Sequence, residues 1–120
     1  MTEMEKLGKI VHALDKHLAR DIVAIDVRGL SDVTDYFVFA TGGSTTQVKA
    51  LCDYVETDLK NGEIAPDRIE GYATSRWILM DYGSVVIHLF LPEAREFYDI
   101  ERLWKDGTPV DITEYLVKEE

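Results

Sequence analysis

Asp81 and His88 are the side chains best placed to do chemistry together, because they lie on neighbouring β-type segments. A carboxylate beside an imidazole could act as a general base or supply two ligands of a metal ion. A hydrolase would also need a nucleophile on a sharp turn, and neither Ser75 nor Ser84 lies in a Gly-x-Ser-x-Gly pattern. A metal site would need a third ligand, and Cys52 and the other histidines lie on different predicted elements. We therefore predict no catalytic residue, no metal and no cofactor.

The Gly-Gly-Ser segment at 42–44 is a second candidate, because the free N–H groups of a following helix could bind a phosphate. It has neither the lysine nor the spacing of a P-loop. A Gly-Ser turn before a helix also begins the nucleotidyltransferase signature, which holds Mg²⁺ with two nearby carboxylates on a later strand. Asp81 has no acidic partner at position 79 or 83. A capping box between Ser44 and Gln47 explains the segment without a ligand.

The elements that position these residues follow from the spacing of apolar residues. Helical spacing predicts helices over 2–19 and from Ser44 to about 61, and Pro92 begins a last helix that is broken at 107–109. β-type runs predict strands at 22–27, 36–40, 77–82 and 85–90, with a possible short strand at 66–70. This order predicts a single-domain α/β (α+β-like) protein, with a mixed sheet and flanking helices over 1–107 and a charged C-terminal tail at 108–120.

The last two strands form a hairpin around Gly83-Ser84, because a two-residue loop with glycine first suits a tight turn. Alternation along the strands gives one apolar face, with Ile78, Met80, Tyr82, Val85, Ile87 and Leu89. The other, here called the mixed face, carries Trp77, Leu79, Asp81, Val86, His88 and Phe90. Either a helix covers the mixed face and leaves Asp81 and His88 at its rim, or this face binds a protein through its aromatic anchors.

Charge is the most informative bulk property. Asp and Glu number 23 against 13 for Lys and Arg, which gives a net charge of −10. Such a field repels nucleic acid, so we expect no direct nucleic-acid readout, and it favours a basic macromolecular partner. No run approaches the ~18 apolar residues of a membrane span, and the N-terminus lacks a signal-peptide layout. A single cysteine, Cys52, predicted to pack in a helix stripe, implies no disulfide, so we expect a cytoplasmic protein.

Three blocks of this sequence resemble one known family. The segment DYFVFATGGSTTQVKAL at 35–51 is similar to a motif of the ribosomal silencing factor (RsfS, or Iojap) family. Glu70-Gly71, followed by WILMDYG at 77–83 and VIHLF at 86–90, is similar to its second block. REFYDIERLW at 95–104 resembles its ending. Ser84 departs from the acidic residue that usually follows the glycine of the turn.

The resemblance implies a non-enzymatic protein whose fold is similar to nucleotidyltransferases but lacks their acidic pair. Members of this family bind ribosomal protein fourteen of the large subunit and block joining of the small subunit, and homodimers occur among them. Organelle relatives assist large-subunit assembly. The alternatives are therefore an assembly factor, a dimeric adaptor or, less favoured, a nucleotidyltransferase-like nucleotide-binding enzyme. The expected partner-binding residues are Trp77, Leu79, Val86 and Phe90 as apolar contacts, Asp81 and His88 as polar contacts, and Arg95 and Tyr98 at the border.

Overall fold

The hairpin predicted around Gly83-Ser84 is present in the computed structural model, which describes residues 2–118. Trp77 lies opposite Phe90 and Asp81 lies opposite Val86, so the pairing has the register that a two-residue turn dictates. Gly83 adopts a φ of 79°, a conformation that glycine takes without steric cost. The predicted division into an apolar face and a mixed face is therefore confirmed.

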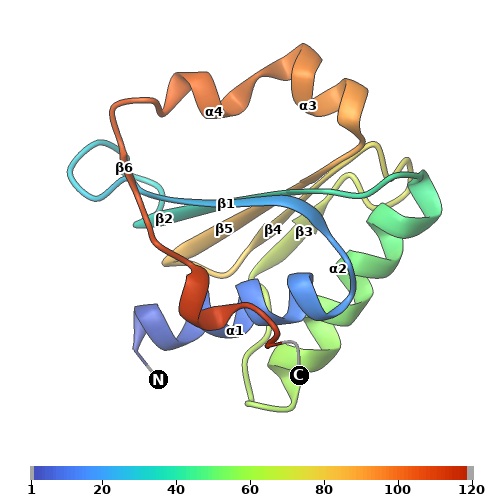
Figure 1. The fold of residues 1–120 in the computed structure, drawn as a ribbon, viewed down its shortest axis with the longest axis horizontal. Helices are drawn as coiled ribbons and strands as arrows, with labels where there is room; N and C mark the ends of the chain where they lie inside the picture. The colour runs from blue at the N-terminus through green and yellow to red at the C-terminus, as the bar shows by residue number, and fades with distance from the viewer. Residues whose placement is uncertain (1, 119–120) are drawn as a thin grey trace.

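Six strands form one sheet in the order β3-β4-β5-β2-β1-β6 (Figure 1). Their bounds are β1 Arg20–Asp26, β2 Tyr36–Thr41, β3 Arg68–Glu70, β4 Trp77–Asp81, β5 Val85–Phe90 and β6 Thr108–Pro109. The β2 and β5 strands pair in parallel and the other neighbours are antiparallel, which confirms a mixed sheet. All residues of β2 and β5 are buried, as expected of central strands covered on both faces.

Two long helices cover the apolar face, α1 (Glu3–Lys16) and α2 (Thr45–Lys60), as Figure 1 shows below the sheet. Thr2 begins α1 with a complete capping box to Glu5, which the sequence reading missed. Ser44 caps α2 by accepting from the Gln47 N–H at 3.1 Å. The Gln47 side chain bonds to the N–H of Gly43 instead of Ser44, so the predicted second half of that box is wrong.

The interior between this face and the two helices is formed mainly by apolar side chains. Each of the six hairpin side chains predicted for it has an exposed fraction of 3% or less: Ile78, Met80, Tyr82, Val85, Ile87 and Leu89. Cys52 packs in the α2 stripe with no exposed surface, as predicted, and burial raises the pKa of its thiol to about 12. A thiol with that pKa stays protonated and unreactive near neutral pH.

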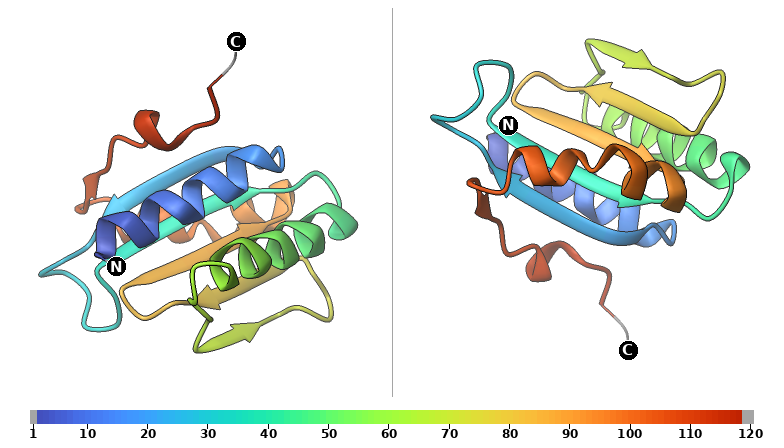
Figure 2. Two further views of the ribbon diagram at one scale, coloured as in Figure 1. Left: turned by 90° about the horizontal axis from the view of Figure 1, so that it is seen from below. Right: turned by 90° about the horizontal axis from the view of Figure 1, so that it is seen from above.

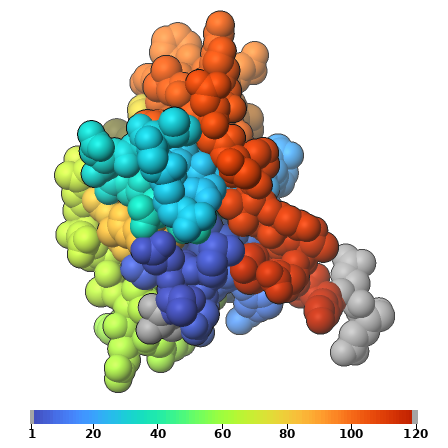
Figure 3. Space-filling model, turned by 90° about the vertical axis from the view of Figure 1, so that its left-hand side faces the viewer, coloured from blue at the N-terminus to red at the C-terminus, as the bar shows by residue number. Residues whose placement is uncertain are grey.

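The chain after α4 (Ile100–Leu103) packs against the domain as far as the structure describes it. Residues 107–118, here called the C-terminal strap, add β6 to β1 and then cross to α1 (Figures 2 and 3). The Tyr115 ring lies so close to Gly8 that a Cβ there would meet it at 2.7 Å. The Tyr115 carbonyl and the Val117 N–H bond to His12 and Asp15. The strap thus joins the middle and the C-terminal part of α1 to the β1 edge of the sheet.

Candidate protein-binding face

Two short helices cover the mixed face: α3 (Pro92–Tyr98) and α4 (Ile100–Leu103), which lie across the sheet on the side opposite α1 and α2 (Figure 2). Pro92 occupies the first turn of α3, as predicted. The prediction of one continuous helix after Pro92 is wrong, because Asp99 takes a left-handed conformation at φ 48° and ψ 47°. The chain changes direction there, so the cover is formed from two short pieces.

Arg95 ties this cover to the sheet. Its Nη1 donates to the Asp21 carbonyl and to the Thr41 hydroxyl, both at 2.8 Å, and its Nε lies 2.7 Å from a carboxylate oxygen of Glu101. The guanidinium therefore joins α3 to α4, to the start of β1 and to the end of β2. Its side chain is only 14% exposed, so Arg95 supports the face from inside rather than bordering it as predicted.

The helices bury one row of the mixed face and leave the other partly accessible. Val86, His88 and Phe90 on β5 have exposed fractions of 3%, 5% and 1%. They present no surface to a partner in this structure, and His88 is not at the rim. The β4 row, formed by Trp77, Leu79 and Asp81, remains half-buried. The sequence allowed either a covered mixed face or an open one. In the structure the β5 row is covered and the β4 row is partly open.

Asp81 and His88 do not form the pair that their shared face allowed. Asp81 accepts the Gly83 N–H at 2.8 Å and lies 3.4 Å from the Arg68 guanidinium. His88 accepts a hydrogen bond at Nδ1 from the Trp77 indole N–H, at 3.0 Å. Burial lowers the pKa of His88 to about 4, so the ring is neutral near pH 7. The imidazole packs against the rings of Phe37, Phe39 and Phe90, and together these four rings are here called the aromatic layer. No carboxylate orients the imidazole for acid–base chemistry.

Aromatic side chains gather where β4 meets α3. Trp77, Phe97 and Tyr98 form what we call the aromatic patch: the Trp77 and Tyr98 rings are 4.8 Å apart, and the Tyr98 and Phe97 rings 5.1 Å. Phe97 is 80% exposed and Tyr98 is 50% exposed. The three rings line a surface hollow of about 560 Å³ with Thr74, Arg76, Glu93 and Ala94. Exposed aromatics around a hollow are typical of protein-binding sites.

Phe97 is the member of the aromatic patch that was not among the partner-binding residues expected from the sequence. In α3 it is Ala94 that faces the sheet, with 5% of its surface exposed. A helix of seven residues offers the sheet one narrow stripe, so its bulky neighbours turn outward. The sequence indicated this arrangement through Ala94, a small residue one helical turn before the aromatic pair Phe97 and Tyr98.

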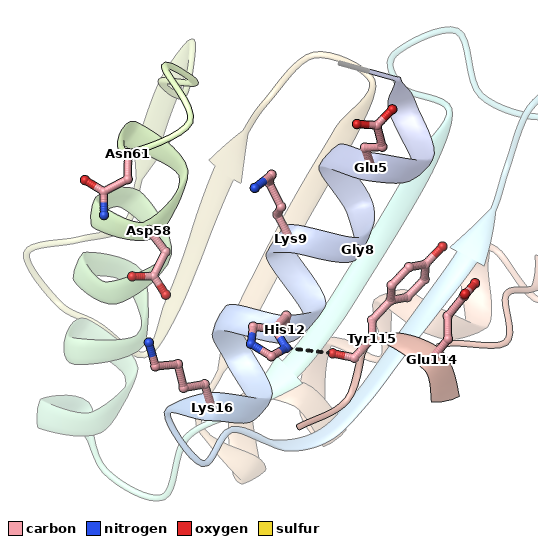
Figure 4. A pocket seen from close by; sticks show the side chains of 9 residues that line it. All are labelled: Glu5, Gly8, Lys9, His12, Lys16, Asp58, Asn61, Glu114 and Tyr115. Carbon is pink, nitrogen blue, oxygen red and sulfur yellow. Dashed lines mark hydrogen bonds between the residues drawn. The ribbon is translucent and has the colours of Figure 1, made fainter. Parts of the chain in front are cut away.

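A second hollow of about 580 Å³ lies on the opposite side, between α1, α2 and the C-terminal strap (Figure 4). Lys9 and Lys16 extend from α1 toward Asp58 on α2 and Asn61 at the end of that helix, and the His12 ring turns to the Tyr115 carbonyl. Its lining mixes lysines with the carboxylates of Glu5, Asp58 and Glu114. Charges of both signs meet here, so the hollow favours no particular charge on a ligand.

Across residues 2–118 no three His, Cys, Asp or Glu side chains gather closely enough to hold a metal ion. The helices of the same segment include none with the length and apolar character to cross a membrane.

The fold and the site define a small α/β domain with an accessible aromatic patch on one side of a mixed sheet. All 120 residues match the family model "Ribosomal silencing factor during starvation". The chain belongs to this ribosomal silencing factor family, whose members are regulatory proteins and not enzymes. The predicted family resemblance is confirmed.

Three relatives illustrate the range of the similarity. The ribosomal silencing factor of Halalkalibacterium halodurans is 35% identical over 112 residues, which cover 93% of this chain and 96% of that protein. A crystal structure of a Chromobacterium violaceum protein has a TM-score of 0.85 and 36% identity, covering 88% of each chain. The mouse protein "Mitochondrial assembly of ribosomal large subunit protein 1" is 41% identical over 101 residues, 82% of this chain and 44% of that protein.

Proposed function

We propose that this protein binds ribosomal protein fourteen of the large ribosomal subunit and thereby prevents the small subunit from joining, which represses translation. Its membership of the ribosomal silencing factor family supports an action on the ribosome. A domain bound over the surface where the subunits meet would exclude the small subunit by its bulk alone. Such a mechanism needs no catalytic group, cofactor or metal.

The aromatic patch is the observation that carries this proposal. Large aromatic side chains are costly to leave in water and are favoured anchors in the centre of protein interfaces. The half-buried β4 row extends the patch, with Leu79 as an apolar contact and Asp81 as a carboxylate beside it. The net charge of −10 suits a basic ribosomal protein and opposes direct contact with rRNA.

A subunit-reassociation assay on a density gradient tests the proposal. Separated ribosomal subunits are mixed with and without this protein, and whole ribosomes are measured. We expect fewer whole ribosomes with the wild-type protein, and unchanged formation of whole ribosomes would overturn the proposal.

A matched pair of variants locates the surface. Trp77→Ala should weaken binding to ribosomal protein fourteen by about thirtyfold, the effect of losing one hot-spot aromatic. Tyr54→Ala is the control, because Tyr54 is an aromatic residue of α2, 46% exposed, on the opposite side of the sheet. Equal affinities for wild type and Trp77→Ala, with both folded, would remove the patch from the binding surface.

A role in large-subunit assembly is the second candidate, and the mouse assembly protein among the relatives favours it. An assembly factor predicts that precursors of the large subunit accumulate when the protein is absent. A silencing factor predicts normal large subunits that join too readily in starved cells. Sedimentation profiles of cells lacking the protein, in rich and in poor medium, separate the two.

We further propose that the protein acts in the cytoplasm and forms a homodimer when it is off the ribosome, as the family resemblance implies. Light scattering on the purified protein gives its mass, and a mass near the 13.7 kDa of one chain at working concentration would contradict the dimer.

A further inference from the structure

The Trp77–His88 hydrogen bond joins an accessible side chain to a buried one. The indole Nε1–H of Trp77 donates to His88 Nδ1 at 3.0 Å, along a diagonal between the two hairpin strands. An indole nitrogen can only donate, so Nδ1 of the imidazole must be the acceptor, and in the neutral ring the proton is on Nε2. The contact therefore fixes the tautomer of His88 as well as the direction of the indole N–H.

The His88 ring is the fixed member of this pair. It stacks on Phe39, with ring centroids 5.1 Å apart and planes at 12°, and lies 5.9 Å from Phe90, with planes at 9°. Phe37 is 5.3 Å away, and only 5% of His88 is exposed. A ring enclosed on several sides cannot turn without displacing its neighbours, so its acceptor atom keeps one position.

Trp77 is held less fully by its apolar contacts. It lies between Phe90, at 5.2 Å, and Tyr98, at 4.8 Å, and remains half-buried. The χ2 torsion of a tryptophan is broad, and stacking on flat rings accepts the indole in more than one orientation. The hydrogen bond to His88 is directional, so it distinguishes between orientations that stacking accepts equally.

Nε2 of His88 is buried and has no hydrogen-bond partner within the part of the chain that the structure describes. A buried donor without an acceptor is destabilising. A phenylalanine at position 88 would stack in the same aromatic layer without the unmatched Nε2–H, but it would leave the Trp77 indole N–H without its acceptor. What the imidazole adds over phenylalanine is the acceptor for Trp77.

We infer that His88 is a positioning residue, which never touches the partner and sets the orientation of the Trp77 indole within the aromatic patch. Its effect on binding rests on the proposed function, but its effect on the indole does not. This differs from the role expected from the sequence, in which His88 was itself a polar contact.

The test uses the full chain with Trp104→Phe, which leaves Trp77 as the single indole. His88→Phe keeps the aromatic stack and removes the acceptor, whereas His88→Asn offers an amide oxygen near the position of Nδ1. The indole N–H resonance of Trp77 and its exchange with solvent are followed by ¹H–¹⁵N NMR. We expect His88→Phe to shift the resonance and speed its exchange at least tenfold, and His88→Asn to restore both in large part.

The same variants are then compared for binding to ribosomal protein fourteen, with Trp77→Ala as the reference for losing the anchor. We expect His88→Phe to weaken binding by about tenfold and His88→Asn to recover most of it. If His88→Phe leaves the indole signal unchanged, the positioning role is overturned whatever the binding shows. If the signal moves and Trp77→Ala weakens binding while His88→Phe does not, the consequence for recognition is overturned.

If Trp77→Ala itself leaves binding intact, the binding surface in the proposed function fails, and the NMR result still decides the positioning role. If His88→Phe does not fold, Trp77→Phe removes the donor instead and keeps a stacked ring. Trp77→Phe should then weaken binding, whereas His88→Asn should not. If a folded Trp77→Phe binds as tightly as the wild type, the inference is overturned.

Discussion

The two faces of the sheet are covered in different ways, and the difference separates stability from recognition. On the apolar face, helices of 14 and 16 residues bury a continuous set of aliphatic side chains. On the mixed face, helices of seven and four residues cover an aromatic layer and leave Phe97 and Tyr98 in solvent. Long helices can bury whole stripes, whereas two short ones cannot, so the second face keeps accessible aromatic surface.

The two faces also enclose different buried titratable groups, and burial shifts their pKa values in opposite directions. The apolar face encloses Cys52 and Tyr82, and burial raises the pKa of both. The mixed face encloses His88, and burial lowers its pKa to about 4. At high pH the free energy of unfolding should therefore fall because groups on the apolar face ionise. At low pH it should fall because His88 on the mixed face is protonated.

The largest expected effect is the loss of packing on the apolar face. Ile87 has no exposed surface, so Ile87→Ala should lower the free energy of unfolding by about 2–5 kcal/mol. Phe97→Ala removes a larger side chain that is 80% exposed, and should change it by less than about 0.5 kcal/mol. Urea unfolding of both variants measures the difference. Comparable losses would mean that the two faces do not divide the work as their burial indicates.

The second prediction concerns acid. The pKa of His88 is about 4 when folded and about 6.5 when unfolded, so the unfolded chain binds the additional proton between these values. The stability that depends on neutral His88 is complete above about pH 6.5 and is lost as the pH falls toward 4. Relative to His88→Asn, which does not titrate, the wild type should lose about 3 kcal/mol over that range. Parallel stability curves for the two proteins would show that His88 is not held neutral by burial.

Local patterns predicted the apolar face well, because each of its residues is specified by its neighbours along the chain. The alternation of side chains and the Gly83-Ser84 turn were enough to place each hairpin residue from 78 to 89 on the correct face. The parallel pairing of β2 with β5 could not be predicted from local patterns, because no turn connects these two strands directly. The cover of the mixed face depended on Asp99, whose left-handed conformation ends α3 after seven residues. That break accompanies the Arg95–Glu101 contact, which is a tertiary feature that periodicity does not encode.

The smallest expected effect tests what holds the cover on the mixed face. Arg95→Met keeps an unbranched apolar stem and removes three hydrogen bonds, so it should lower the free energy of unfolding by about 1–3 kcal/mol. Hydrogen exchange should quicken in α3 and α4 while α1 is unchanged, because Arg95 contacts the ends of β1 and β2 and not the opposite layer. Arg102→Met, at an exposed position on α4, is the matched control and should change neither measurement. Faster exchange spread equally over both layers would instead mean that the two covers unfold as one unit, and that Arg95 stabilises the whole domain.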